Sequence, residues 1–318
     1  MKKLFSLLFV LLSFGLAGCG EDEKKTEETK KPATEQTEEK AAFPVTLTDS
    51  VDNEVTLEAK PEKIVSIMPS ITEILFAVGS GEEVVAGTDF DNYPEEAQNL
   101  EKIGGMEFNV EKIISLQPDL VLAPESGYAL GQTGLEQIEE AGIPVLVVDD
   151  ATNFDEVYAS IEFIGKATGH MEEASNIIED MKTTLNELKE KASSIEEAEK
   201  KNVFIEVSGD PLFTVGTSTF MHEILMAISA NNVVEEEGWV ELNEEKVVSL
   251  NPDVVITTYG EGAAEQVLAR EGWQGVSAIS NEEVYEVNSD LVSRPGPRLV
   301  QGVEEVAKVI YPEVFTNE

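Results

Sequence analysis

Few side chains in this sequence of 318 residues could carry out covalent or metal chemistry. Cysteine occurs once, as Cys19, and histidine twice, as His170 and His222, which lie far apart at the expected starts of helices. The sequence contains no Gly-x-Ser-x-Gly motif, no phosphate-binding loop and no cysteine–histidine pair. A bare zinc or manganese site needs several histidines or carboxylates within reach. We therefore expect no catalytic residues, no metal site and no bound cofactor. The side chains present suit non-covalent ligand binding instead.

An internal repeat is the most informative pattern in the chain. The matched segments, in the same order in both copies, are 73–78 with 223–228 and 109–122 with 243–256. The second segment of each copy reads as a short helix after an asparagine N-cap, Asn109 or Asn243, which ends at a Pro-Asp pair before an apolar strand. Two motifs that are each used twice predict two related lobes.

The repeat places two carboxylates, Glu111 and Glu245, in equivalent positions one residue inside these helices. Helix N-termini lie on the side of the strand carboxyl ends, where open α/β sheets bind ligands. We therefore expect Glu111 and Glu245 to flank the mouth of a cleft, one on each lobe. A rival pair, Glu73 and Glu223, is weaker, because residues 70–73 read as a capping box that explains Glu73 structurally.

The elements that position these residues alternate between strands and helices, which predicts an α/β fold with two Rossmann-like lobes, each with a small parallel sheet. The expected strands are 63–68, 83–87, 120–123, 144–148, 202–207, 254–257 and 283–287. Residues 45–57 read as a hairpin with Asp52-Asn53 at its turn. Helical periodicity covers 154–167 and 172–191, and the charged run to residue 201 contains no turn cluster, so one long helix is expected to join the lobes.

The N-terminus has the features of a lipoprotein signal peptide over residues 1–18. Two lysines precede an apolar run over 4–16, which is shorter than the ~20 apolar residues that cross a bilayer. The position of Cys19 after Leu-Ala-Gly resembles the bacterial lipobox, whose cysteine is acylated, for example with palmitate. We expect a membrane-anchored protein on the extracytoplasmic face of the cell membrane, as on a Gram-positive cell surface. Residues 19–43, poor in large apolar side chains, would be a disordered acylated tether.

The formal net charge of −41 bears on the partners of the chain. Nucleic acids and anionic lipid surfaces repel such a protein, so neither is expected as a binding partner. The bilayer would be engaged through acylated Cys19 alone.

Motifs spread over residues 45–315 resemble the helical-backbone (class III) solute-binding proteins of ABC importers, of the type that binds vitamin B12 and iron-siderophores. The similarity is strongest to the B12-binding branch. Besides both copies of the repeat, the motifs are Pro61-Glu62-Lys63-Ile64-Val65-Ser66, residues 69–79, Asp91-Asn92-Tyr93-Pro94, Phe213-Thr214-Val215-Gly216, Gly238-Trp239 and Arg294-Pro295-Gly296-Pro297-Arg298.

The resemblance implies an N-terminal lobe (44–150), a helical linker with a long backbone helix (151–198) and a C-terminal lobe (199–318), with ligand held between the lobes. It implies no enzymatic activity. The ligand would be delivered to a homodimeric ABC permease and its ATPase. In that family the glutamates at the positions of Glu111 and Glu245 dock on permease arginines, and a symmetric pair of carboxylates suits a two-fold partner.

The candidates for ligand binding fall in expected strand-to-helix loops and offer rigid aromatic area or charge. They are Phe90, Tyr93, Tyr128, Phe213, Trp239, Tyr259, Asp290 and Arg294. The resemblance places Phe90, Trp239, Asp290 and Arg294 at positions that contact the corrinoid in the B12-binding branch. The segments 104–106 and 124–125 depart from that branch, because each lacks a tryptophan that it can carry. Trp273 is expected in the core instead.

The arginine content bears on the cargo. The chain contains Arg270, Arg294 and Arg298 and no other arginine, whereas a buried polyanionic siderophore needs several basic partners. A cobalamin (vitamin B12)-like corrinoid is the preferred ligand, with a hydroxamate-type ferric siderophore or haem as alternatives. Two other classes stay open, a surface chelatase of the same fold and a lipoprotein sensor that presents ligand to a receptor.

Overall fold

The computed structural model describes residues 43–316, apart from the side chains of residues 129 and 130. The signal peptide, Cys19 and all of the predicted tether except residue 43 lie outside the described residues. Within the described part, none of the helices combines the length and apolar character needed to cross a membrane.

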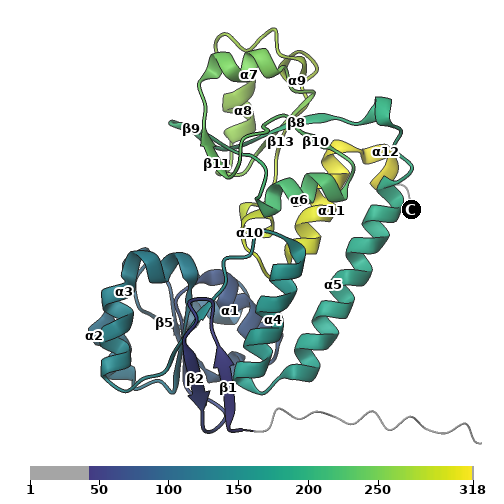
Figure 1. Cartoon of the computed structure of the whole chain (residues 1–318). Coiled ribbons are helices and arrows are strands. Elements are labelled where there is room, and N and C mark those ends of the chain that lie inside the picture. Colours follow the sequence, from purple (N-terminus) through teal and green to yellow (C-terminus); the bar gives the residue numbers. More distant parts are fainter. Residues whose placement is uncertain (1–42, 317–318) are drawn as a thin grey trace, which may run out of the picture. The chain divides into compact units, whose positions relative to one another are not determined.

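The N-terminal lobe contains a five-stranded parallel sheet of order β5-β4-β3-β6-β7 (Figure 1). Its two central strands are buried along their whole length, because helices cover both faces of the sheet. The strands are β3 (Ile64–Ser66), β4 (Val84–Gly87), β5 (Glu101–Lys102), β6 (Leu120–Pro124) and β7 (Val145–Val148). The helices are α1 (Pro69–Ala77), α2 (Val110–Leu116) and α3 (Glu125–Glu140), with 3₁₀ turns at Gly81–Glu83 and Glu95–Asn99.

The predicted hairpin is confirmed as the antiparallel pair β1 (Val45–Thr48) and β2 (Glu54–Leu57). Asp49 holds its turn, because one carboxylate oxygen accepts hydrogen bonds from the backbone N–H groups of Val51 and Asn53, at 3.1 and 2.9 Å. The other oxygen accepts from the N–H of Val147 in β7, which ties the hairpin to the edge of the sheet.

The C-terminal lobe contains a six-stranded sheet of order β11-β9-β8-β12-β13, with β10 paired to β8. Here β8, β10, β12 and β13 are parallel, but β9 pairs antiparallel with both β8 and β11, so this sheet is mixed where only parallel strands were expected. The strands are β8 (Asn202–Gly209), β9 (Leu212–Val215), β10 (Asn231–Asn232), β11 (Trp239–Glu241), β12 (Val254–Thr257) and β13 (Val284–Glu286). The helices are α6 (Phe220–Ala227), α7 (Glu244–Leu250), α8 (Ala263–Leu268), α9 (Ser277–Ser280), α10 (Ser289–Ser293), α11 (Leu299–Ile310) and α12 (Pro312–Phe315).

The sequence repeat is confirmed as a structural one. The side chains of Asn109 and Asn243 cap α2 and α7 by accepting from the N–H of the third helical residue. Both helices end in a residue with positive φ, at Gln117 and Asn251. In each lobe the strand after this helix pairs in parallel with the first strand of that lobe, β6 with β3 and β12 with β8.

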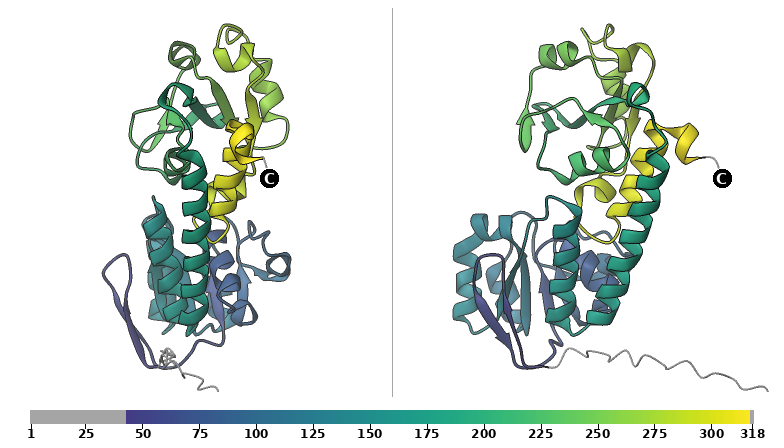
Figure 2. Two further views of the ribbon diagram at one scale, coloured as in Figure 1. Left: turned by 90° about the vertical axis from the view of Figure 1, so that its right-hand side faces the viewer. Right: turned by 45° about the vertical axis from the view of Figure 1, so that its right-hand side comes forward.

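Two long helices follow β7 in the chain, α4 (Phe154–Thr168) and α5 (Met171–Ala192), separated by a turn with Gly169 at φ 77°. Helix α5 contacts α1 and α4 of the N-terminal lobe and α6 and α11 of the C-terminal lobe, as Figures 1 and 2 show. The charged run that follows does not extend the helix to residue 201. It contains a turn and a 3₁₀ segment, Glu197–Glu199, because it lacks the apolar stripe that packs a helix onto the core.

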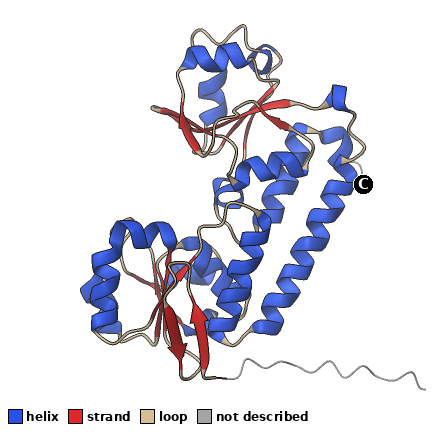
Figure 3. Ribbon diagram, in the orientation of Figure 1, coloured by secondary structure: helices blue, strands red, loops and turns tan. Residues whose placement is uncertain are grey.

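The hydrophobic core has three parts among the described residues. A large cluster runs without interruption from the inner face of one sheet, through α1, α4, α5, α6 and α11, to the inner face of the other. Two smaller clusters cover the outer faces of the two sheets. The helices stacked between the red strands in Figure 3 are those of the shared cluster. This continuous core makes the junction of the lobes a packed interface, which favours small relative motions over wide hinge opening.

Candidate ligand-binding site

A space of about 490 Å³ lies between the lobes, and we name it the interlobe cleft. The N-terminal lobe contributes the segments that follow β3, β4, β6 and β7. The C-terminal lobe contributes the β9–α6 connection, the start of β11 and the end of α10. Residues on its walls include Met68, Phe90, Asp150, Phe220, Trp239 and Arg294. Its position beyond the carboxyl ends of the strands is the one expected for ligand binding in α/β sheets.

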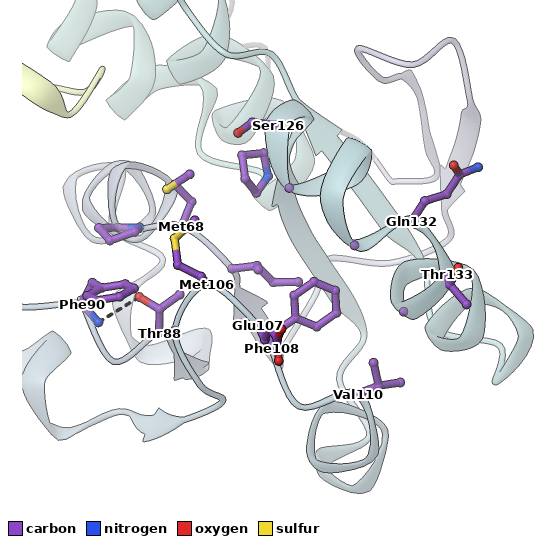
Figure 4. Close-up of a pocket in the computed structure, with 17 residues that line it drawn as sticks. Met68, Thr88, Phe90, Met106, Glu107, Phe108, Val110, Ser126, Gln132 and Thr133 are labelled. Carbon is purple, nitrogen blue, oxygen red and sulfur yellow. Dashed lines mark hydrogen bonds between the residues drawn. The ribbon is translucent and has the colours of Figure 1, made fainter. Parts of the chain in front are cut away.

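A second space of about 560 Å³ adjoins the cleft and is lined by the N-terminal lobe alone, and we name it the first-lobe chamber. Met68, Pro69, Phe90 and Ser126 line both spaces, so the two lie side by side. Figure 4 shows Met68 and Phe90 toward one end of the chamber and Gln132 and Thr133 of α3 toward the other. Together the two spaces are large enough for a ligand of several hundred cubic ångströms.

Three of the predicted ligand-binding residues line the cleft, namely Phe90, Trp239 and Arg294. The rings of Phe90 and Trp239 remain 52% and 58% exposed, which is unusual for such large apolar side chains. Phe90 belongs to the N-terminal lobe and Trp239 to the C-terminal lobe. Two exposed rings on opposite walls form a surface that a planar or bulky apolar ligand could cover.

Three other predicted residues do not line the cleft or the chamber, although Tyr259 lies in its expected loop. Tyr128 lies inside α3 and packs against the outer core of the N-terminal lobe. Phe213 lies within β9, paired with Glu241 of β11. Tyr259 follows β12, but its hydroxyl donates to Glu206 at 2.6 Å. None of the three lines the cleft or the chamber, because a helix begins directly after β6 and an extra antiparallel strand occupies the sheet edge.

Glu73 forms the centre of an ion cluster between the lobes. The prediction that Glu73 belongs to a capping box at residues 70–73 is wrong. Helix α1 begins one residue earlier, with Pro69 in its first position and no side-chain cap. Glu73 is only 3% exposed. Its carboxylate accepts hydrogen bonds from Arg294 Nη1 at 2.8 Å and from Arg298 Nε and Nη2 at 2.8 and 2.6 Å.

The remaining members of this cluster surround Arg294. Asp290 pairs with Arg294 Nη2 at 2.9 Å, and Asn92 accepts from Arg294 Nη1 at 2.7 Å while donating to Asp290. Arg294 Nη2 also donates to the backbone carbonyl of Phe90 at 3.3 Å. The predicted residue Tyr93 stacks under Arg298, whose guanidinium lies 3.8 Å from the ring centre. Arg294 therefore faces the cleft with its charge already balanced.

The cleft and chamber are electrostatically neutral to acidic. Among the described residues that line them, the charged ones are Glu107, Asp150 and the paired Arg294. Just outside, partial desolvation together with the negative charges of Asp149 and Asp150 raises the pKa of Glu125. A polyanionic ligand would meet no unpaired cation on these walls, whereas a neutral or cationic ligand meets no such barrier.

A second buried ion cluster, in the C-terminal lobe, holds Arg270, so this arginine does not reach the cleft. Glu206 is completely buried and forms two hydrogen bonds with Arg270, each 2.7 Å long. The guanidinium of Arg270 stacks 4.4 Å from the ring centre of Trp273, which is fully buried as the sequence predicts. Burial, a hydrogen bond to Glu206 and the charge of Glu206 raise the pKa of Tyr259 to about 12.

Glu111 and Glu245 lie in equivalent positions in the first turns of α2 and α7, and both are exposed. Within residues 43–316 neither carboxylate has an ion-pair or hydrogen-bond partner. The lysine after each does have one, because Lys112 pairs with Glu101 at 2.7 Å and Lys246 lies 4.0 Å from Glu236. The repeat therefore leaves one carboxylate on each lobe available to another molecule.

The two histidines lie near helix starts, away from each other. His170 precedes α5 and lies 2.9 Å from Lys60 Nζ, while the backbone of His222 in α6 donates to Thr219. Over the part of the chain that the structure describes, no three His, Cys, Asp or Glu side chains are grouped to hold a metal ion.

Several residues on the walls were not identified from the sequence. Met68 precedes α1, and Met106 lies in the loop after β5, with its side chain 81% exposed. Asp150 follows β7 and accepts from the N–H of Ser126 at 2.7 Å. All three follow the carboxyl ends of strands, so this positional signal was present in the sequence. Their side chains carry no motif, and methionines are usually placed in cores.

Comparisons with known proteins agree with this architecture. A profile of the Periplasmic binding protein family matches residues 64–291. The ABC transporter substrate-binding lipoprotein YvrC of Bacillus subtilis is 46% identical over 319 residues, 99% of each chain. The vitamin B12-binding protein of Pectobacterium atrosepticum is 30% identical over 255 residues, which cover 78% of this chain and 88% of that protein.

A solved structure gives the same picture. The possible iron-binding (periplasmic solute-binding) protein of Staphylococcus epidermidis superposes with a TM-score of 0.72 and 32% identity, over 80% of this chain and all of that one. The family profile, the nearly full-length match and the cleft between two lobes point to one conclusion. The chain belongs to the Periplasmic binding protein family and is a substrate-binding protein of an ABC transporter.

Proposed function

We propose that the cargo of this substrate-binding protein is a cobalamin-like corrinoid held in the interlobe cleft. The observation that carries the proposal is the wall chemistry, with exposed Phe90 and Trp239 on opposite lobes and no unpaired cation between them. A corrinoid offers a broad ring system for the aromatic contacts and carries neutral amides around its edge. The 30% identity to a vitamin B12-binding protein supports the same cargo.

A hydroxamate-type ferric siderophore is the second candidate, because the lack of unpaired cations on the walls favours any ligand without excess negative charge. Haem is less well supported, since its two carboxylates would need cationic partners. Neither His nor Tyr is among the residues that line the cleft or the chamber, although Met68 and Met106 offer thioethers.

Thermal unfolding of the purified protein with cyanocobalamin, a ferric hydroxamate and haem would test the cargo. A ligand present at 100 times its Kd stabilises the folded state by about 2.7 kcal/mol. The corrinoid is expected to raise Tm, and Trp239→Ala to weaken its binding. Trp273 would be no control, because its side chain is buried, so Met226→Ala on the exposed side of α6 serves instead. No shift with the corrinoid and a shift with the hydroxamate would reverse the assignment.

Delivery of the cargo would use Glu111 and Glu245 as docking contacts for a permease dimer that works with an ATPase. The support is their equivalence and exposure and the lack of partners in the described residues. Acylation of Cys19, which lies outside those residues, would hold the protein at the extracytoplasmic face of the membrane near the permease. The name of the B. subtilis relative, which includes the word lipoprotein, supports this anchoring.

Uptake by cells that carry Glu111→Ala/Glu245→Ala would test the docking contacts. We expect transport to be lost while the purified variant binds cargo with unchanged affinity. Glu140→Ala/Glu265→Ala removes the same charge from other exposed helical positions and is expected to transport normally. Equal transport by the two double variants would rule out the docking role.

A further inference from the structure

The first-lobe chamber is an extension of the binding site with its own walls. Phe108 from the loop before α2, Val110 at the start of α2 and glycines of α3 lie on the part that the interlobe cleft does not share. The chamber is as large as the cleft, at about 560 against 490 Å³. A ligand confined to the cleft would leave this adjoining space to water.

Glycines keep the chamber open. A Cβ atom at Gly131 would lie 2.7 Å from Phe108 Cε1, and one at Gly134 would lie 3.0 Å from Phe108 Cε2. Any other residue at Gly131 would therefore displace the Phe108 ring that forms the wall. Helix α3 also departs from helical geometry at Gly131, where φ is −119° and ψ is 17°. The wall is thus built from backbone that approaches an aromatic ring closely, which only glycine permits.

The chemistry of the walls selects the group that fits. Met68, Met106 and Phe108 offer apolar and polarisable surface, and Thr88, Ser126 and Gln132 offer hydrogen bonds. Glu107 is the charged residue among the described wall residues. An uncharged group with both ring faces and hydrogen-bonding edges, such as a nucleoside, matches this lining, whereas an anionic group does not.

We infer that the first-lobe chamber is a second subsite, which receives a bulky uncharged axial substituent of the corrinoid while the ring system occupies the interlobe cleft. The inference rests on the proposed function, because a corrinoid is the cargo whose axial group would enter the chamber. Met106, 81% exposed at the chamber, is the residue best placed to control its size without disturbing the core.

Titration of the purified full-length protein with adenosylcobalamin and cyanocobalamin tests this inference, because the two differ only in the size of the axial group. Met106→Trp reduces the chamber and is expected to weaken adenosylcobalamin at least tenfold, while cyanocobalamin changes by less than threefold. Met226→Trp places the same ring on the exposed side of α6, outside both spaces, and is expected to retain both affinities. Trp239→Ala, in the cleft, is expected to weaken both corrinoids equally.

Each alternative result has a distinct meaning. If Met106→Trp changes both affinities by the same factor, or neither, the subsite is wrong and the corrinoid cargo stands. If neither corrinoid binds the unaltered protein, the proposed cargo is wrong, and the subsite for its axial group is overturned with it. Unfolding curves of these variants are measured before the titrations, to establish that each variant is folded.

Discussion

Removal of the Glu73 carboxylate should destabilise the protein far more than removal of a surface charge. Glu73 is 3% exposed and is the shared partner of Arg294 and Arg298, whose side chains are only 13% and 14% exposed. Glu73→Gln removes the carboxylate that pairs with Arg298 and leaves Asp290 as the acidic partner of Arg294, with two guanidinium groups close together. Breaking a buried ion pair on one side costs about 3–5 kcal/mol. At about 2–4 °C per kcal/mol for a chain of this size class, Tm should fall by on the order of 10 °C.

The assay is thermal and urea unfolding of Glu73→Gln beside a matched surface variant. Glu304→Gln breaks an ion pair with Lys308, in which the charged atoms lie 2.7 Å apart and the side chains of Lys308 and Glu304 are 45% and 46% exposed. Its loss should lower the free energy of unfolding by no more than about 0.5 kcal/mol. A triple variant, Glu73→Leu/Arg294→Met/Arg298→Met, removes the three buried charges and should recover most of the lost stability.

The same substitution should also affect the site. Arg294 joins Glu73 to Asn92 and to the backbone of Phe90, so loss of Glu73 releases the loop that carries one aromatic wall of the cleft. We expect weaker cargo binding in Glu73→Gln than in Glu304→Gln. A loss of less than 1 kcal/mol in Glu73→Gln, or a triple variant less stable than the single one, would refute this account of the cluster.

Three further predictions concern the C-terminal lobe. The pKa of Tyr259 is raised to about 12, against about 10 in an unfolded chain. Its contribution to the free energy of unfolding is therefore complete below pH 10 and is lost as the pH rises toward 12. Urea unfolding across this pH range should show a smaller loss of stability for Tyr259→Phe than for the unaltered protein. Gly216→Ala should destabilise the lobe and displace Trp239, because the added Cβ would lie 1.7 Å from the carbonyl oxygen of Glu236. An unchanged near-ultraviolet circular dichroism spectrum of the tryptophans would contradict this displacement. Trp239→Ala should leave Tm within about 2 °C of the unaltered protein, since the ring is 58% exposed, and a larger fall would show that the ring is a core residue.

Much of the fold follows from local sequence patterns. The apolar strand segments, the asparagine caps and the repeat predict the elements and the two equivalent lobes, because short-range periodicity and capping act over a few residues. The exposed pair Glu111 and Glu245 follows from the same repeat. The prediction was wrong where a local pattern had two explanations, as at residues 70–73, where Pro69 rather than Ser70 starts the helix.

The arrangement of the site depends on contacts that no local pattern encodes. Glu73 meets Arg294 across 221 positions of sequence, and that pairing decides that this arginine does not offer a free charge to the cargo. The sequence predicts loops at Tyr128 and Phe213, but Tyr128 lies in a helix that packs against the outer core, and Phe213 lies in a strand paired at the sheet edge. These tertiary contacts outweigh the local sequence signals.

The sequence by itself determined the fold class, the duplicated lobes and the cleft between strand ends, because these follow from the spacing of apolar and capping residues along the chain. Only the tertiary structure decided which charges are neutralised and which volumes stay open. The chamber beside Phe108 exists because glycines of α3 approach a ring from a different segment, and such an approach depends on how the helices pack, not on their periodicity.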